Sequence, residues 1–490
     1  MSAHRTASSG SPGQAPLHFV HPRQFKANTQ QAVDDPLLRK SFRSAMDFLQ
    51  NKRSGHFSDR IEFEKLRQVG EAIRRYSLSR LPDLLEQLEH KLTDRGVQVH
   101  WASNAEEANA LFLAIARRHG ATSMIKGKSM VSEEIELNHR MAEHGINCLE
   151  SDMGEYIVQL AGERPSHIIM PAIHKTKQQI AELFAEKIHQ APYTEDVDEL
   201  IAIGRRVLRQ EFRDARIGVS GVNFMVAETG TLVLVENEGN GRMCTTLPEV
   251  HIAITGIEKV VERFEHVLPL FSLLTRSATG QAVTTYFNAI TGPRREGELD
   301  GPQEMHLILL DNGRSQAFQD EDFRATLQCI RCGACMNHCP VYARIGGLAY
   351  GTTYPGPIGS IISPHLMGLE ETQDLPTASS LCGACSEVCP VGIPIPDLLM
   401  QLRTAAKHQP QPGKTELAGQ GRARDWKEVL AWRTWAWINE RPGLYRNLIR
   451  WGRFFRGFTP NWQGGWTRHR TPMKLAPSGL RDRLMPASKR

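Results

Sequence analysis

Seven of the nine cysteines fall into two groups whose spacing suits iron–sulfur ligation. The first group follows C-x2-C-x2-C-x3-C-P, and the second repeats its last three cysteines and its proline fifty residues later. The cysteines are Cys329, Cys332, Cys335 and Cys339, then Cys382, Cys385 and Cys389. Both copies contain Cys-Gly-Ala-Cys and Cys-Pro-Val, so they form an internal repeat. The full run is typical of bacterial ferredoxins, and it predicts a protein that handles electrons.

The spacing also predicts how the two groups share their ligands. In ferredoxins with two clusters, the fourth cysteine of each run ligates the other cluster. The expected ligands of cluster 1 are Cys329, Cys332, Cys335 and Cys389, and those of cluster 2 are Cys339, Cys382 and Cys385. We therefore expect two [4Fe–4S] clusters.

The second copy lacks one cysteine, because its alignment on the first places Ser379 opposite Cys329. Cluster 2 is then either a [4Fe–4S] centre whose fourth ligand is Ser379, solvent, a remote residue or a partner, or a [3Fe–4S] centre. Structural zinc is the alternative to both, but zinc sites pair CxxC motifs and do not need the longer run. The remaining thiols, Cys148 and Cys244, are expected to be small buried hydrophobes.

The chain is long enough for two or three domains. Strand-like and helical stretches alternate from residue 97, which predicts an α/β domain with a largely parallel sheet. The expected parts are a flexible tail over 1–33, a helical segment over 34–95, the α/β domain over 96–313, a ferredoxin-type iron–sulfur domain over 314–408, and a basic C-terminal segment over 409–490.

Composition indicates a cytoplasmic protein. Residues 1–33 lack the apolar core of a signal peptide, and no stretch has the eighteen or more apolar residues of a membrane span. Clustered cysteines without an export signal point to a reducing compartment and to metal ligation.

Several residues of the α/β part are candidates for binding or acid–base chemistry. Lys126-Gly-Lys128-Ser129 follows a predicted strand and could hold an anion, although we favour a surface turn with two solvated lysines. Asp152 and Glu155 could act as acid and base, or Asp152 could cap a helix. His174, at a predicted strand end, could accept a proton from a hydroxy acid, but a lone histidine is more often structural. No nucleotide-binding fingerprint accompanies these residues.

The C-terminal segment is rich in tryptophan and arginine. Seven of the eight tryptophans lie between Trp426 and Trp466, and sixteen Lys or Arg face four Asp or Glu from Arg422 onward. Such a surface could dock a partner subunit, lie on an anionic membrane, or wrap the protein's own domains. We favour wrapping and partner docking, with membrane contact at most peripheral and no nucleic acid.

An α/β domain followed by this cysteine pattern resembles the lactate utilization protein B family of bacterial iron–sulfur subunits. The resemblance covers most of the chain and includes the motifs Glu150-Ser-Asp-Met-Gly-Glu155, Pro171-Ala-Ile-His174-Lys175, Ala227-Glu-Thr-Gly230, Leu247-Pro248 and the Tyr354 loop between the cysteine groups. It implies an α/β fold similar to the NagB/RpiA/CoA transferase superfamily and an all-α helical ferredoxin domain. The family also has three cysteines in its second motif, so Ser379 is no departure.

The resemblance implies an electron-transfer subunit of a complex that oxidises L-lactate to pyruvate, so that lactate serves as carbon and energy source. The implied partners are a protein with cysteine-rich repeats and a shorter protein with a related α/β domain, and the chain is not a complete catalyst alone. Two rival functions stay open. One is the iron–sulfur subunit of a glycolate or disulfide oxidoreductase, and the other is a redox-sensing or assembly protein.

Overall fold

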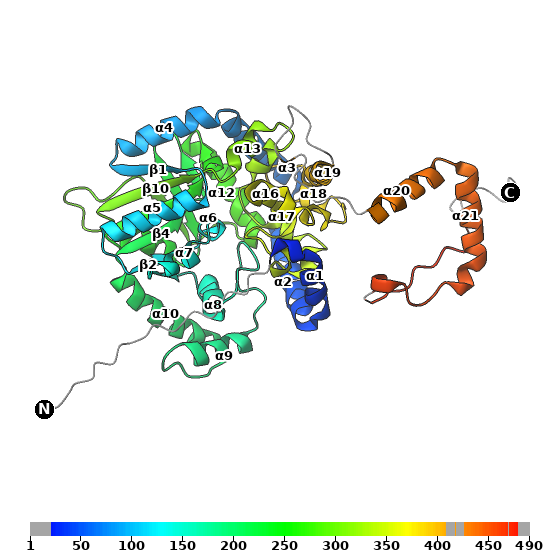
Figure 1. Cartoon of the computed structure of the whole chain (residues 1–490). Helices are drawn as coiled ribbons and strands as arrows, with labels where there is room; N and C mark the ends of the chain where they lie inside the picture. The colour runs from blue at the N-terminus through cyan, green and yellow to red at the C-terminus, as the bar shows by residue number, and fades with distance from the viewer. Residues whose placement is uncertain (1–20, 408–416, 418–425, 469, 479–490) are drawn as a thin grey trace. The chain divides into compact units, whose positions relative to one another are not determined.

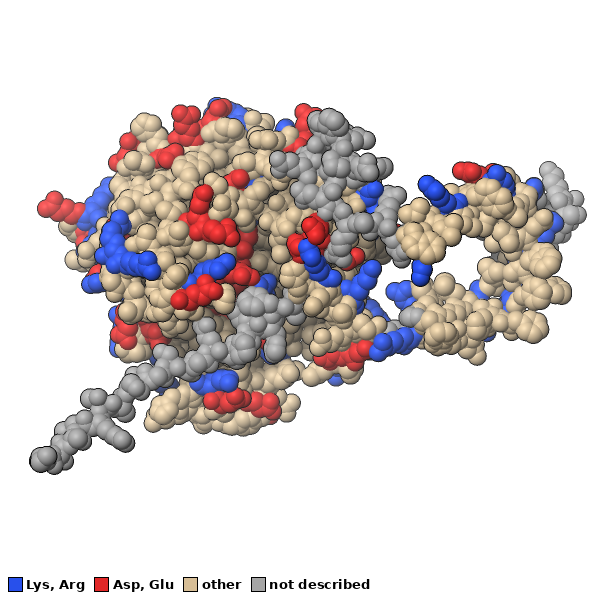
Figure 2. Space-filling model, viewed as in Figure 1, with Lys and Arg blue, Asp and Glu red and all other residues tan. Residues whose placement is uncertain are grey.

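The computed structural model describes residues 21–407, 417, 426–468 and 470–478. The chain divides into two compact units, Met1–Gly421 and Arg422–Arg490, which are described separately. The visible face of the larger unit carries acidic and basic side chains interspersed (Figure 2). Within the described residues, no helix has the combined length and apolar character that crossing a membrane requires.

A six-stranded sheet in which every neighbouring pair is parallel forms the centre of the larger unit. Its order is β1-β10-β7-β4-β2-β3. The strands are β1 (Val97–Ala102), β2 (Ser123–Lys126), β3 (Asn147–Glu150), β4 (Ile217–Gly221), β7 (Val250–Gly256) and β10 (Glu304–Leu310). The predicted α/β domain with a parallel sheet is thus confirmed.

Helices cover both faces of this sheet, because successive side chains of a strand point to opposite faces. Leu307 and Leu309 of β10 pack in one core cluster with the leucines of α4 (Leu81–Thr93). Ile308 and Leu310 pack in another cluster with α5 (Ala105–Arg118). The central strands are therefore apolar on both sides, as parallel strands buried between helices must be. Three further helices of this domain are α8 (Met153–Ala161), α9 (Lys177–Lys187) and α10 (Val197–Asp214).

A second, four-stranded sheet of order β8-β5-β6-β9 lies in the same domain. Its strands are β5 (Phe224–Val226), β6 (Thr231–Glu236), β8 (Val260–Val261) and β9 (Tyr286–Ile290). Val226 and Val233 pack in one cluster with residues of α12 (Phe264–Thr279) and with the cysteine loops. This sheet therefore joins the α/β domain to the region that follows it.

Over residues 314–407 every regular element is helical. The elements are α13 (Arg314–Gln319), η3 (Arg324–Gln328), α14 (Ala334–Asn337), α15 (Tyr342–Ile345), η4 (Leu348–Tyr350), α16 (Gly356–Met367), α17 (Leu369–Thr372), η5 (Leu375–Thr377), α18 (Ala384–Glu387) and α19 (Ile395–Ala405). They gather beside the α/β domain, next to α3 (Figure 1).

The helices at the start of the described chain pack on this helical region. They are α1 (Phe25–Asp34), α2 (Pro36–His56) and α3 (Arg60–Ser79). The ring of Phe25 lies 5.5 Å from that of Tyr350, and the ring of Phe42 lies 5.7 Å from that of Tyr342. The sequence places residues 25–33 in a flexible tail, whereas α1 forms there because Phe25 is buried against this region.

Three local details of the α/β domain follow from backbone geometry and side-chain bonds. Asn104 caps the helix after β1, because its side chain accepts the N–H of Glu107 at 2.9 Å. The helices α6 (Met130–Glu134) and α7 (Leu137–Glu143) are separate elements, interrupted where Glu136 has φ 53°. Residues 167–170 are irregular, and the His167 ring accepts the backbone N–H groups of Ile169 and Met170 there.

The smaller unit contains α20 (Trp426–Asn439) and α21 (Pro442–Phe454), which contact each other. Neither helix has a buried residue. Trp426 and Trp451 are each 69% exposed, so the described part of this unit presents an aromatic surface. Wrapping and partner docking stay predictions for this surface.

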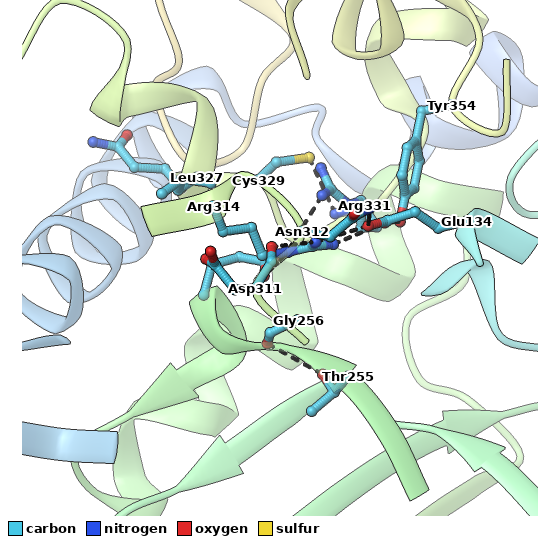
Figure 3. A network of polar contacts seen from close by, with 12 residues as sticks. Glu134, Thr255, Gly256, Asp311, Asn312, Arg314, Leu327, Cys329, Arg331 and Tyr354 are labelled. Atoms are coloured by element: carbon cyan, nitrogen blue, oxygen red, sulfur yellow. Dashed lines mark hydrogen bonds and ion pairs between the residues drawn. The ribbon is translucent and has the colours of Figure 1, made fainter. Parts of the chain in front are cut away.

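A network of buried charges fixes the first cysteine loop to the end of the parallel sheet (Figure 3). Arg314 donates from Nε to Glu258 at 2.7 Å and from both terminal nitrogens to Glu134 at 2.8 Å. Arg331, between two cysteines, donates to Glu258 at 3.3 Å. Arg74 of α3 donates to backbone carbonyls on both sides of this junction, those of Glu258, Val260, Leu327 and Gln328.

Replacing Glu258 tests this junction. Glu258→Gln leaves Arg331 without its carboxylate in a buried setting, and breaking a buried ion pair costs about 3–5 kcal/mol. We expect a lower midpoint in anaerobic thermal unfolding of the cofactor-loaded protein. Glu296→Gln, at an exposed position, should leave the midpoint unchanged, and equal midpoints for both variants would contradict a holding role for Glu258.

Candidate functional site

The two cysteine loops have the same backbone conformation, so the sequence repeat is also a structural repeat. Arg331 and Leu381, one residue before the second cysteine position of each copy, have φ of 61° and 54°. Gly333 and Gly383 follow with φ of 76° and 83°. The N–H groups of the residues three positions after these glycines donate to the glycine carbonyls at 3.0 Å in both loops. Non-glycine residues rarely adopt positive φ. Positive φ at both equivalent positions therefore shows that the two loops share one backbone conformation.

Backbone amides point at the cysteine sulfurs. The N–H of Arg331 donates to Cys329 Sγ at 3.3 Å, and that of Ile393 donates to Cys389 Sγ at 3.4 Å. Of the seven clustered cysteines, six are buried and Cys382 is exposed. N–H donors stabilise the thiolate relative to the thiol. The thiolate is the form of cysteine that ligates metal.

Electrostatic neighbours divide the seven thiols into two groups. Burial raises the pKa of Cys335 well above its usual value, and the neighbouring charges of Cys332, Cys329 and Cys389 raise it further. Burial raises the pKa of Cys385 to about 11, with added contributions from Cys339 and Cys382.

Such a collection of buried thiols is unfavourable without a metal, since each thiolate opposes ionisation of the next. A bound cation deprotonates a coordinating thiol outright, and soft thiolate ligands are those that iron–sulfur clusters use. The residues present therefore fit iron–sulfur ligation.

Ser379 stands in the second loop where Cys329 stands in the first. The N–H of Leu381 donates to Ser379 Oγ at 3.1 Å, just as the N–H of Arg331 donates to Cys329 Sγ. The hydroxyl thus has the same backbone partner as the sulfur that it replaces. It lies beside exposed Leu381 and Cys382, so this end of the second loop faces solvent.

The interpretation of residues 126–129 as a surface turn with two solvated lysines is wrong. Lys126 is fully buried, and its Nζ lies 2.6 Å from Glu150 and 2.9 Å from Glu133. The parallel register of β2 and β3 pairs Lys126 with Glu150, which brings the two charges together inside the domain. Lys128 is also tied to the protein, because its Nζ donates to the carbonyl of Ile169 at 2.7 Å.

Asp152 caps helix α8, which is one of the two roles that the sequence left open. Its carboxylate accepts the N–H of Glu155 at 3.0 Å. Glu155 is buried, and burial raises its pKa well above the usual value even though Lys128 lies 3.8 Å away. Glu238 accepts the N–H of Met153 at 3.1 Å, and burial together with the charge of Asp152 raises the pKa of Glu238 to about 7.

His174 lies in a turn and not at a strand end. Its Nε2 is 2.6 Å from Glu163 and its Nδ1 is 2.7 Å from Ser166 Oγ. Lys175 also bonds Glu163, at 2.5 Å. Both ring nitrogens of His174 are therefore engaged by the chain itself, which favours a structural role.

A cavity of about 460 Å³ lies at the carboxyl ends of β2 and β4. Its cationic lining residues are Lys52, Lys128, Lys259 and Arg331, and its acidic ones are Asp152, Glu236 and Glu238. Arg331 connects this cavity to the cysteine loop. Of the candidate residues named from the sequence, Lys128, Ser129 and Asp152 line the cavity, and its other walls come from distant segments.

Comparison with known proteins assigns the three parts of the chain. Residues 85–310 match the LUD domain, residues 325–393 match the 4Fe-4S dicluster domain, and residues 401–487 match the family described as lactate utilisation protein B, C-terminal. Lactate utilization protein B of Bacillus subtilis (strain 168) is 44% identical over 380 residues, which is 77% of this chain and 79% of that one. The chain belongs to the lactate utilization protein B family.

Two further relatives agree with this assignment. Lactate utilization protein B of Bacillus velezensis is 41% identical over 428 residues, covering 87% of each chain. The uncharacterized electron transport protein YkgF of Escherichia coli (strain K12) is 42% identical over 423 residues, covering 86% of each chain. A solved structure of a duf162 family protein from Deinococcus radiodurans has 16% identity and a TM-score of 0.27, with 47% of this chain and 98% of that chain covered.

Family membership confirms the resemblance read from the sequence. The 4Fe-4S dicluster match also confirms that the clustered cysteines belong to an iron–sulfur domain. The assignment of individual cysteines to cluster 1 or cluster 2 stays a prediction.

Two substitutions of Asp152 separate capping from acid–base chemistry. Loss of a helix cap costs about 1 kcal/mol, whereas Asn caps as well as Asp. We expect Asp152→Ala to lower the unfolding midpoint and Asp152→Asn to keep both the midpoint and the lactate-dependent growth of cells that carry it. Normal stability with lost growth in Asp152→Asn would instead identify the carboxylate as an acid or base.

Proposed function

We propose that this chain is the iron–sulfur electron-transfer subunit of a multi-subunit, cytoplasmic complex that oxidises L-lactate to pyruvate. Its partners are a protein with cysteine-rich repeats and a shorter protein with a related α/β domain. The observation that carries the proposal is the duplicated cysteine loop in a member of the lactate utilization protein B family. The bound clusters supply one-electron transfer, and the chain is not a complete catalyst alone.

The proposed ligand sets follow the two thiol groups. Cluster 1 has the ligands Cys329, Cys332, Cys335 and Cys389, and cluster 2 has Cys339, Cys382 and Cys385. The charge interactions of Cys335 and Cys385 support this division, because each thiol interacts with members of its own set. We also propose that the α/β domain has the NagB/RpiA/CoA transferase-like fold and that residues 314–408 form an all-α helical ferredoxin domain.

The two cysteine groups differ in their exposure to solvent, and this difference suits electron transfer from one group to the other. Cys332 and Cys335 are buried in one core cluster with residues of α1 and α2, and the half-buried guanidinium of Arg53 in α2 interacts with Cys332 and Cys389. Cys382 is exposed. Electrons received near the buried group would leave for a partner at the exposed one, because transfer between proteins needs an accessible centre.

Growth and metal analysis test the proposed function. A strain that lacks the gene should fail to grow on L-lactate, and the wild-type gene should restore growth. Cys335→Ala should not restore it, whereas Cys148→Ala should, since Cys148 is a buried residue of β3 outside the repeat. Protein purified without oxygen should contain iron and sulfide.

Two results would overturn the function. Unimpaired growth of the deletion strain on L-lactate would favour a glycolate or disulfide oxidoreductase. Zinc without iron or sulfide in the anaerobic protein would exclude both the redox subunit and a redox sensor.

Ser379 is proposed to stand at the fourth ligand position of cluster 2. Ser379→Cys would then supply a thiolate where the backbone already provides the matching N–H donor. We expect any [3Fe–4S] EPR signal that mild oxidation produces in the wild-type protein to be lost in this variant. Thr377→Cys, at an exposed position of η5, is the control and should keep the signal. A signal of equal size in Ser379→Cys would place the fourth position elsewhere.

A further inference from the structure

We propose that the cavity at the carboxyl ends of β2 and β4 binds a small organic acid, of the 2-hydroxy or 2-oxo carboxylate class, whose carboxylate is held by Lys259 and Arg331. The inference rests on the proposed function and adds a ligand site on this chain, beside the first cysteine group. Three features of the described residues carry it.

The first feature is the position of the cavity in the sheet. Within the six-stranded sheet, the strand that comes next after β2 is β3 on one side, and the strand that comes next after β4 is β7 on the other side. In open parallel sheets, ligands bind outside the carboxyl ends of the strands at the point where the order reverses. Gly221 at the end of β4 keeps this point compact, because a Cβ there would come within 3.1 Å of Ser129.

The second feature is a pair of buried cations whose hydrogen-bonding capacity is not fully used by the described residues. Lys259 is 7% exposed, and its ammonium makes no hydrogen bond or ion pair within the described residues. Arg331 reaches Glu258 through Nη2, but its Nη1 is buried and has no hydrogen-bond partner. Both residues line the cavity. Buried charges need partners, and a carboxylate accepts several charge-assisted hydrogen bonds at once.

The third feature is the charge balance around this wall. Arg74, Arg314, Arg331 and Lys259 are all buried, and the carboxylates bonded among them are Glu134 and Glu258. Four cations thus face two carboxylates. The negative charge of Glu258 and of the Cys329 thiolate acts on Lys259 from one side, and Lys259 also lines the cavity, where a bound anion would meet it directly.

The rest of the lining favours a small acid over a polyphosphate. Asn223, Asn240 and Gln281 contribute neutral amide side chains to the lining. Asp152, Glu236 and Glu238 would repel the extended negative charge of a nucleotide. A small acid would place its carboxylate at Lys259 and Arg331, and its neighbouring hydroxyl or carbonyl oxygen at the neutral amide side chains.

Binding would be visible at the first cysteine group. The backbone N–H of Arg331 donates to Cys329 Sγ, while its guanidinium lines the cavity and stacks on the Tyr354 ring at 4.5 Å. A carboxylate on this guanidinium changes the field at the sulfur. Ligand binding should therefore alter the EPR spectrum of the reduced protein without any turnover.

The test is an anaerobic calorimetric titration of the cofactor-loaded protein with L-lactate, pyruvate and inorganic phosphate, with EPR spectra at the end points. We expect the two acids to bind and to shift the spectrum, and phosphate to bind more weakly. Lys259→Gln removes a charge-assisted hydrogen bond and should weaken acid binding about tenfold or more. Lys259→Arg should restore most of the affinity, and Lys65→Gln, on the exposed side of α3, should change nothing.

Each remaining outcome overturns the inference. Equal acid affinity in wild type and Lys259→Gln, at equal iron content, would remove Lys259 from a ligand site. Tighter binding of phosphate than of either acid would exclude the proposed ligand class. No binding of either acid to wild-type protein whose clusters and growth on lactate are normal would show that the cations serve the cluster alone, and would leave the proposed function intact.

Discussion

The carboxylate of Glu258 is the constraint on which this structure depends. Burial alone would raise its pKa, yet the charges of Arg314 and Arg331 lower the pKa of Glu258 to about 2. Glu258 lies in the turn directly after β7, Arg314 begins the helix that follows β10, and Arg331 belongs to the first cysteine loop. One buried anion therefore ties together two strand ends and the iron–sulfur region. If Glu258 were neutral, Arg314 and Arg331 would be buried without this counter-charge. Separating the α/β domain from the iron–sulfur region therefore carries a large free-energy cost.

This junction makes the two halves of the cysteine repeat unequal. The first loop is clamped between the α/β domain and the N-terminal helices, and its cysteines are buried. The second loop repeats the same backbone conformation, but the equivalents of Cys329, Arg331 and Cys332 are Ser379, Leu381 and exposed Cys382. The repeat thus gives two similar loops in different surroundings: the first lies beside the interior cavity, and the second faces solvent.

Much of the site could be predicted from sequence because its cysteines lie in two short segments. The spacing of the cysteines and the place of Ser379 are properties of short segments, and the structure repeats them in backbone hydrogen bonds. The parallel sheet was predictable for the same reason, because each strand and each helix is indicated by the hydrophobic pattern of its own short segment. Lys126 was misread because its partner Glu150 lies on the neighbouring strand, and only the register of β2 and β3 brings them together. The cavity was missed for a similar reason, as Lys128, Lys259 and Arg331 come from three distant segments.

Arg331 shows most directly why an α/β domain and an iron–sulfur domain would be kept in one chain. Its φ of 61° is unfavourable for a side chain with a Cβ, and such strain costs about 1–3 kcal/mol unless the surroundings enforce it. The surroundings do enforce it: Glu258 bonds the guanidinium, and the ring of Tyr354 stacks on it. The same conformation points the backbone N–H at Cys329 Sγ and leaves Nη1 at the wall of the cavity without a partner. A leucine holds the equivalent strained position in the second loop, so the loop itself does not require an arginine there. The contacts of the guanidinium with Glu258 and with the cavity wall therefore account for an arginine at position 331.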